Sequence, residues 1–185
     1  MNNGNSVLLV VDMQAGFVSS KSAPVVPHVV DLVDRWEALG RDVVFTRFIN
    51  RPGSQFERLI HWSRFMPGAE EVEIIDELAP HAARAAAVVD KVGQYSPFTT
   101  EFTRLVNVHG WSQMVICGIA TESCVMKSAC DAFEQGYTPW VVTDACASHA
   151  GADKHEAGLL VIKRFIGRGQ LVDAASVIDG SAQAA

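Results

Sequence analysis

Residues 113–124 read QMVICGIATESC, and this stretch decides the fold. It opens with a short apolar run, MVIC, between polar residues and Gly118, a pattern typical of a strand that is buried on both faces. Gly118 is expected to end this strand. The residues that follow Cys124, VMKSACDAFEQG, predict a helix that ends at Gly136. Cys124 is therefore expected where a buried strand turns into a helix.

This position gives Cys124 a candidate chemical role. Backbone N–H groups at a helix N-terminus are unpaired, and the helix dipole favours negative charge there. We expect such a thiol to have a lowered pKa, and the thiolate is the nucleophilic form of cysteine. The alternative is a small apolar residue packed at the start of a helix, and the rest of the chain has to decide between the two.

Apolar runs alternate with helical spacings along the whole chain. Strands are predicted at residues 6–11, 42–48, 85–90, 114–117, 139–143 and 170–172, and helices at residues 28–39, 69–78, 100–109, 125–135 and 153–166. Loops are predicted at residues 24–27 and 95–98, and residues 50–66 are interpreted as an excursion over the sheet edge rather than a core element. This alternation predicts an α/β fold with a parallel sheet and helices on both of its faces.

Polar or reactive residues follow the predicted strands. In parallel α/β sheets, ligands bind beyond the carboxyl ends of the strands, where the strand order switches. The residues expected along this edge, although far apart in sequence, are Asp12, Arg47, Lys91, Cys124 and Asp144.

A cysteine, an acid and a base at one edge indicate a nucleophilic site. Cys124 would attack an electrophilic carbon, and Asp12 would take the thiol proton and return it to the leaving group. Lys91 would hold the carboxylate, and backbone N–H groups at the strand-to-helix turn would receive the oxyanion. Asp12 could instead cap a turn, with Asp90 or Asp144 as the acid, and Lys91 could be a surface residue.

The composition argues against several classes of protein. The chain has 185 residues, 49% of them hydrophobic and 19% charged, with a formal net charge of -6. We expect one domain over residues 1–185, with residues 178–185 as a flexible tail. Unclustered basic residues argue against nucleic acid, and no apolar run approaches the ~20 residues that span a bilayer. The N-terminus lacks the pattern of a signal peptide, so a cytoplasmic location with reduced cysteines is expected.

Three blocks of sequence together resemble the isochorismatase-like cysteine hydrolases. They are VLLVVDMQAGF near the start, a lysine after the third strand followed by YSPF, and GIATESCV before a helix. The resemblance covers nearly the whole chain and implies a three-layer α/β/α fold with a six-stranded, mostly parallel sheet. It also implies a catalytic triad of Asp12, Lys91 and Cys124. It further implies a cis peptide between Ile119 and Ala120, with the N–H groups of Ala120 and Cys124 as the oxyanion hole.

The chain departs from relatives of the nicotinamidase type. Those members carry Asp-x-His after the second strand, where they bind a metal, whereas this chain has Arg47 and Ile49 at about those places. No metal and no cofactor is therefore expected. Three residues, VGQ, stand between the lysine and Tyr95, where relatives more often have two. Members that hydrolyse the vinyl ether of isochorismate can lack the cysteine, so the presence of Cys124 favours acyl transfer.

The sequence thus predicts a metal-independent cysteine hydrolase that cleaves a C–N bond of a small amide or ureide through an acyl-thioester. The alternatives are isochorismate-type ether hydrolysis, or a non-catalytic or redox-sensing protein that uses Cys124 as an oxidisable thiol. We expect a homodimer or homotetramer, with no nucleic-acid or membrane partner. The residues expected to line the substrate pocket are Phe17, Arg47, Trp62, Phe65, Tyr95 and Phe98.

Overall fold

Parallel strands form the centre of the molecule. The structure is a computed structural model and describes residues 5–181. Its six-stranded sheet has the order β3-β2-β1-β4-β5-β6, and every neighbouring pair is parallel. The strands are β1 (Ser6–Val11), β2 (Val43–Ile49), β3 (Ala87–Val92), β4 (Gln113–Ile119), β5 (Thr138–Ala147) and β6 (Leu171–Val172). The predicted α/β fold class is confirmed.

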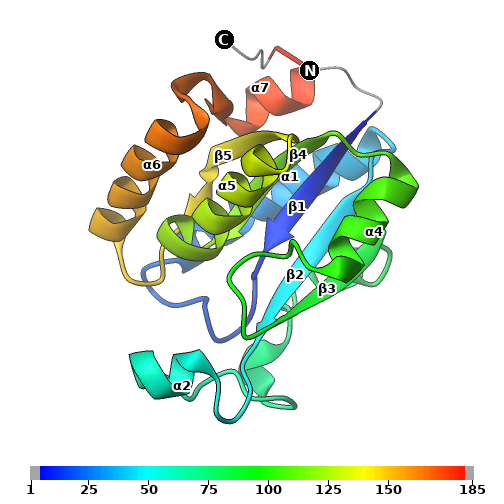
Figure 1. Cartoon of the computed structure of the whole chain (residues 1–185). Helices are drawn as coiled ribbons and strands as arrows, with labels where there is room; N and C mark the ends of the chain where they lie inside the picture. The colour runs from blue at the N-terminus through cyan, green and yellow to red at the C-terminus, as the bar shows by residue number, and fades with distance from the viewer. Residues whose placement is uncertain (1–4, 182–185) are drawn as a thin grey trace.

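Helices cover both faces of this sheet (Figure 1). In that view α1 (Val26–Ala38) lies behind the sheet, while α4 (Thr100–His109) and α5 (Met126–Glu134) lie in front of it. The remaining α-helices are α2 (Gln55–Ile60), α3 (Ala79–Ala82), α6 (Ala152–Ile166) and α7 (Ala174–Asp179). No helix within residues 5–181 has the length and apolar character needed to cross a bilayer.

The strand order switches direction between β1 and β4. All residues of β1 are buried, as expected for an apolar strand with a neighbour on each side and helices on each face. Val11 pairs with Gly118 across this junction. The residues just beyond both strands therefore lie side by side at the switch point, where α/β sheets bind ligands.

Four strands, β2 to β5, end later than predicted. β4 continues through Gly118 to Ile119, with a register shift against β5 that absorbs the glycine. β3 extends through Lys91, which lies in the strand rather than after it. β5 extends past Asp144, whose exposed carboxylate accepts a bond from the Ala174 N–H at 3.0 Å. The placement of Arg47, Lys91 and Asp144 beyond strand ends was therefore wrong, because all three lie within strands.

Two predicted segments differ from the structure near a proline. The predicted loop 24–27 contains a 3-10 turn, Ala23–Val25, and the beginning of α1. The predicted helix 69–78 contains only a 3-10 turn, Glu70–Val72, and Pro80 lies in the first turn of α3. Proline suits the first turn of a helix because its missing N–H would be unpaired there in any case.

Residues 50–66 belong to the core more than predicted. They contain α2, whose N-cap Ser54 accepts a bond from the Glu57 N–H at 3.2 Å. Phe56 and Phe65 are buried, and both pack against Phe48 of β2. The excursion therefore carries aromatic side chains back onto the sheet edge.

The predicted tail is partly helical, since residues 178 and 179 close α7. The expected flexibility of residues 182–185 lies outside the described residues. Leu160 and Phe165 of α6 are 69% and 58% exposed. Such apolar exposure is compatible with an interface between subunits, and the homodimer or homotetramer stays a prediction.

We expect Gly118→Ala to lower the free energy of unfolding by about 3 kcal/mol or more. Gly118 has a φ of +112°, and a Cβ there would lie 2.1 Å from the Val11 carbonyl oxygen. Left-handed backbone costs roughly 1–2 kcal/mol for other residues, and overpacking adds about 1–3. Urea denaturation measures the loss.

Gly136→Ala is the matched control for this substitution. Gly136 also has a positive φ, +85°, and a Cβ there would meet nothing within 4 Å. Only the backbone cost of about 1–2 kcal/mol should remain. Equal losses in the two variants would show that the close approach of β1 and β4 does not constrain residue 118.

Candidate functional site

A cavity of about 310 Å³ opens beside the switch point between β1 and β4. Its walls are mostly aromatic and apolar, as is usual for small-molecule sites. The lining residues are Phe17, Phe48, Phe56, Ile60, Trp62, Tyr95, Ala120, Glu122, Ser123, Cys124 and His149.

Asp12 follows β1 directly and is fully buried. Its backbone has a φ of +48°. Thr46 of β2, which lies next to the end of β1, holds Asp12 by two hydrogen bonds. The Thr46 hydroxyl accepts a bond from the Asp12 N–H at 3.2 Å and donates one to Asp12 Oδ1 at 2.6 Å. One carboxylate oxygen, Oδ2, is left to face other partners.

Lys91 supplies the partner of that oxygen. Its ammonium group is fully buried and donates to Asp12 Oδ2 at 2.6 Å and to the Tyr95 carbonyl at 2.6 Å. Burial acts to lower the pKa of Lys91, but the neighbouring Asp12 and Cys124 outweigh burial and raise it. Lys91 is therefore positively charged at neutral pH.

Cys124 lies in a π-turn, Thr121–Val125, between β4 and α5, and it is buried. Burial raises the pKa of its thiol to about 12; Lys91 lowers it and Asp12 raises it by charge and by a hydrogen bond. The expected lowering of this pKa was wrong, because loss of hydration outweighs the lysine. The resting thiol is protonated, and a nucleophilic role would require a base.

The turn that carries Cys124 is held from the side of α6. The Thr121 hydroxyl forms a 2.8 Å hydrogen bond with His155 Nδ1, so it does not act as an N-terminal cap of the turn. A Cβ at Gly158 would lie 2.8 Å from the Glu122 backbone, so the absence of a side chain there allows α6 to approach the turn closely. The peptide between Ile119 and Ala120 is cis, as expected.

The structure brings together only part of the predicted pocket wall. Phe17, Trp62 and Tyr95 line the cavity. Phe65 is fully buried behind Phe17, with ring centroids 4.1 Å apart. Phe98 lines a separate surface groove beside α4. Sequence position could not separate these cases, because an aromatic residue in a loop can serve either the core or a cavity.

Arg47 also lies away from the cavity. Its guanidinium forms paired bonds to Asp90, at 2.8 and 3.0 Å, and a 3.4 Å ion pair with Glu73. Side chains alternate along a strand, so Arg47 and the cavity-lining Phe48 point to opposite faces. The same pairing occupies Asp90, which therefore does not take the place of Asp12 beside Cys124.

Sequence reasoning missed several lining residues: Phe48, Phe56, Ile60, Glu122, Ser123 and His149. Glu122 and Ser123 stand next to Cys124, so their closeness to it was available as a signal. His149 follows β5 and offered only its place beyond a strand. Ile60 comes from the excursion, where nothing in the sequence indicated the direction of the side chain.

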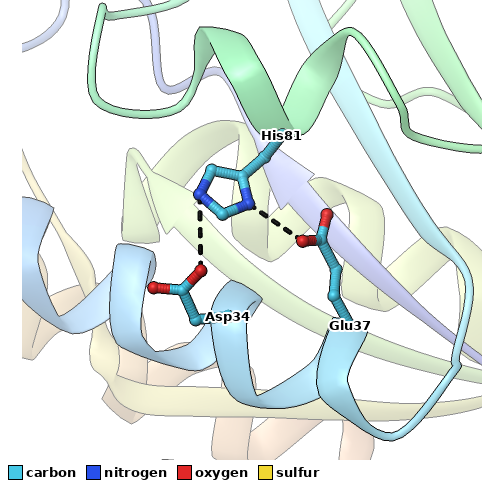
Figure 2. A group of neighbouring side chains, drawn as sticks. All are labelled: Asp34, Glu37 and His81. Carbon is cyan, nitrogen blue, oxygen red and sulfur yellow. Dashed lines mark hydrogen bonds and ion pairs between the residues drawn. The ribbon is translucent and has the colours of Figure 1, made fainter.

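The cavity residues do not fit a metal ion. Within residues 5–181, one group of three His, Cys, Asp or Glu side chains lies close enough together to hold a metal ion: Asp34, Glu37 and His81 (Figure 2). None of the three lines the cavity. Arg84 donates to the same Glu37 carboxylate at 2.6 Å, and its positive charge disfavours a cation there. This cluster instead ties α1 to α3 through His81, which contacts both carboxylates.

Comparison with known proteins points to one family. The isochorismatase domain family matches residues 6–173. Nicotinamidase 3 of Arabidopsis thaliana is 28% identical over 163 residues, covering 86% of this chain and 81% of that protein. Ureidoacrylate amidohydrolase RutB of Acinetobacter baylyi is 27% identical over 194 residues, covering 88% and 78%. A solved cysteine hydrolase from Pseudomonas syringae superimposes with a TM-score of 0.85 at 23% identity, covering 99% and 96%.

We expect Asp12→Asn to move the ionisation of Cys124 to lower pH. Asp12 raises the pKa of this thiol, so removing its charge increases the thiolate fraction at any pH below about 12. The measurement is the pH dependence of iodoacetamide labelling at Cys124, read by peptide mapping. Asp31→Asn, on exposed surface of α1, is the control and should leave the profile unchanged. A midpoint that stays or rises in Asp12→Asn contradicts the geometry.

Proposed function

The chain belongs to the isochorismatase domain family of hydrolases, and we propose that within this family it is a metal-independent cysteine amidohydrolase. Its substrate is a small amide or ureide, and the bond cleaved is C–N. The observation that carries this proposal is the buried Asp12–Lys91 ion pair, 2.6 Å long, which interacts with the Cys124 thiol at the cavity wall.

In the first step, Cys124 Sγ attacks the carbonyl carbon of the substrate. Its pKa of about 12 means that the proton has to leave as the C–S bond forms. Asp12 accepts that proton as general base. Its backbone and side-chain bonds to Thr46 hold the carboxylate in place for the transfer.

In the second step, the tetrahedral intermediate collapses. The C–N bond breaks, Asp12 returns the proton to the departing nitrogen, and an acyl-thioester remains on Cys124. Water then attacks the thioester with Asp12 as base. The acid product leaves, the C–S bond breaks, and the thiol regains its proton.

Two further features support these steps. The positive charge of Lys91 keeps the Asp12 carboxylate paired and lowers the cost of negative charge near sulfur. The backbone N–H groups of Ala120 and Cys124 are proposed to receive the oxyanion. The Thr121 hydroxyl, which could have capped the turn, bonds His155 instead.

The environment of Cys124 favours hydrolysis over the redox alternative. Oxidant sensors depend on exposed thiols of low pKa, and Cys124 is 5% exposed with a raised pKa. The names of the relatives also favour amide cleavage over ether cleavage, since one is a nicotinamidase and one an amidohydrolase.

We expect the purified protein to release ammonia from members of a panel of small amides and ureides. Asp12→Asn, Lys91→Met and Cys124→Ser should each lower turnover roughly 10²–10⁴-fold or more, the range for general acid–base catalysis. Lys154→Met removes an exposed lysine and should keep wild-type rates. Circular dichroism checks that each variant is folded.

Two outcomes would contradict this proposal. Folded Asp12→Asn with normal turnover would remove Asp12 as the base. Release of pyruvate from isochorismate, with no ammonia from any amide, would assign the ether reaction instead.

Activity should survive exhaustive chelation, and elemental analysis of the active protein should find no stoichiometric zinc, iron or manganese. The reason is the donor chemistry. Arg47 is paired with Asp90 and always charged, Ile49 has no lone pair, and catalytic zinc usually needs three protein ligands. Loss of activity with a chelator, restored by one of these metals, would overturn the metal-free mechanism.

A further inference from the structure

One carboxylate in the cavity wall has an oxygen atom that accepts no hydrogen bond from the described part of the chain. Glu122 lines the cavity, and its Oε1 accepts a 2.7 Å bond from the Ser148 hydroxyl. Its other oxygen, Oε2, is buried and has no hydrogen-bond partner within residues 5–181. Buried carboxylate oxygens normally accept bonds, so Glu122 has acceptor capacity that no group within residues 5–181 uses.

No cation in the cavity wall balances this carboxylate. The eleven lining residues include neither lysine nor arginine. His149 lines the same wall, but burial lowers its pKa below 6.5, so the ring is neutral at pH 7. Lys91 is committed to Asp12. The local charge therefore favours a donor or a positive group on the ligand and disfavours an anion.

Two positively charged residues whose charges reach the cavity wall are paired with acids. Arg64 and Lys154, whose charges reach His149 and Glu122, form ion pairs with Glu71 and Asp153. Both side chains are 56% exposed. Each is therefore already paired with an acid that does not line the cavity.

The rest of the wall consists of aromatic rings. Trp62 lies 5.3 Å from Phe48 and 6.1 Å from Phe17, centroid to centroid, and Tyr95 lies 5.0 Å from Phe56. Ring faces carry partial negative charge and attract cations and N–H groups. The negative potential of the ring faces therefore adds to that of the Glu122 carboxylate.

We propose that Glu122 selects the substrate: it accepts a bond from an N–H or ammonium group on the part of the molecule beyond the scissile carbonyl. The substrate class is then a small, planar, carboxylate-free amide with a nitrogen donor. This inference rests on the proposed amidohydrolase function and narrows it. A carboxylate substrate, which the name of the ureidoacrylate relative implies for that enzyme, meets repulsion here.

The test compares three amides that share the benzamide ring and differ in the group at position 3: benzamide, 3-(aminomethyl)benzamide and 3-carbamoylbenzoate. Wild-type kcat/KM for the ammonium compound should exceed that for the carboxylate by about a hundredfold or more, as for a bond to a charged group. Glu122→Gln keeps the acceptor for Ser148 and removes the charge, and it should shrink this ratio at least about tenfold.

Glu156→Gln is the matched control. Glu156 is exposed on α6, and its replacement should leave the ratio unchanged. Thermal melting confirms that both variants are folded. Calorimetric binding of the same three amides to Cys124→Ala supplies a second measurement that does not depend on turnover.

The outcomes separate the inference from the proposed function. Hydrolysis of the amides with no preference against the carboxylate, or a preference that Glu122→Gln leaves intact, overturns the role of Glu122 and leaves the function standing. Selective binding of the ammonium compound without hydrolysis of any amide supports the role of Glu122 and contradicts the function. Failure of all three compounds to bind overturns the substrate class.

Discussion

The ion pair between Lys91 and Asp12 is the interaction on which the rest of the site depends. Both side chains are completely buried, and either charge alone would be very costly to hold away from water. Removal of one partner of such a pair typically costs about 3–5 kcal/mol, because the other charge is left unpaired. The pair therefore ties the end of β1 to β3, and through the Tyr95 carbonyl it also fixes the loop after β3.

Burial and, to a smaller extent, the same pair set the protonation state of Cys124. Loss of hydration raises the pKa of the thiol, and the ammonium of Lys91 only partly offsets that rise. A protonated resting thiol is chemically quiet, which suits a cysteine that should react with a substrate and not with oxidants. The proposed base is already within reach, so binding of an electrophile, rather than ionisation beforehand, starts the reaction.

The aromatic wall of the cavity has a different origin from this chemistry. The ion pair and the π-turn come from the strands at the switch point, while Phe56, Ile60 and Trp62 come from residues 50–66. Figure 1 shows this excursion, with α2, beyond the tip of β1. The excursion thus adds an aromatic wall to a site built by the sheet, and a change in the excursion can alter the pocket without moving Asp12 or Lys91.

The sequence by itself determined the strands of the sheet and placed Asp12 and Cys124 after two of them. The spacing of apolar residues and the positions of turn-forming residues are local features of the sequence. For this reason β1, α4 and the strand before Cys124 could be predicted from their own residues. Only the tertiary structure decided the environment of each side chain. Arg47 is directed away from the site by strand alternation and by Asp90, and burial raises the Cys124 pKa against the helix-dipole expectation. Glu122 and His149 meet at one wall because α6 and β5 pack against the turn, a contact between distant residues that no local pattern encodes.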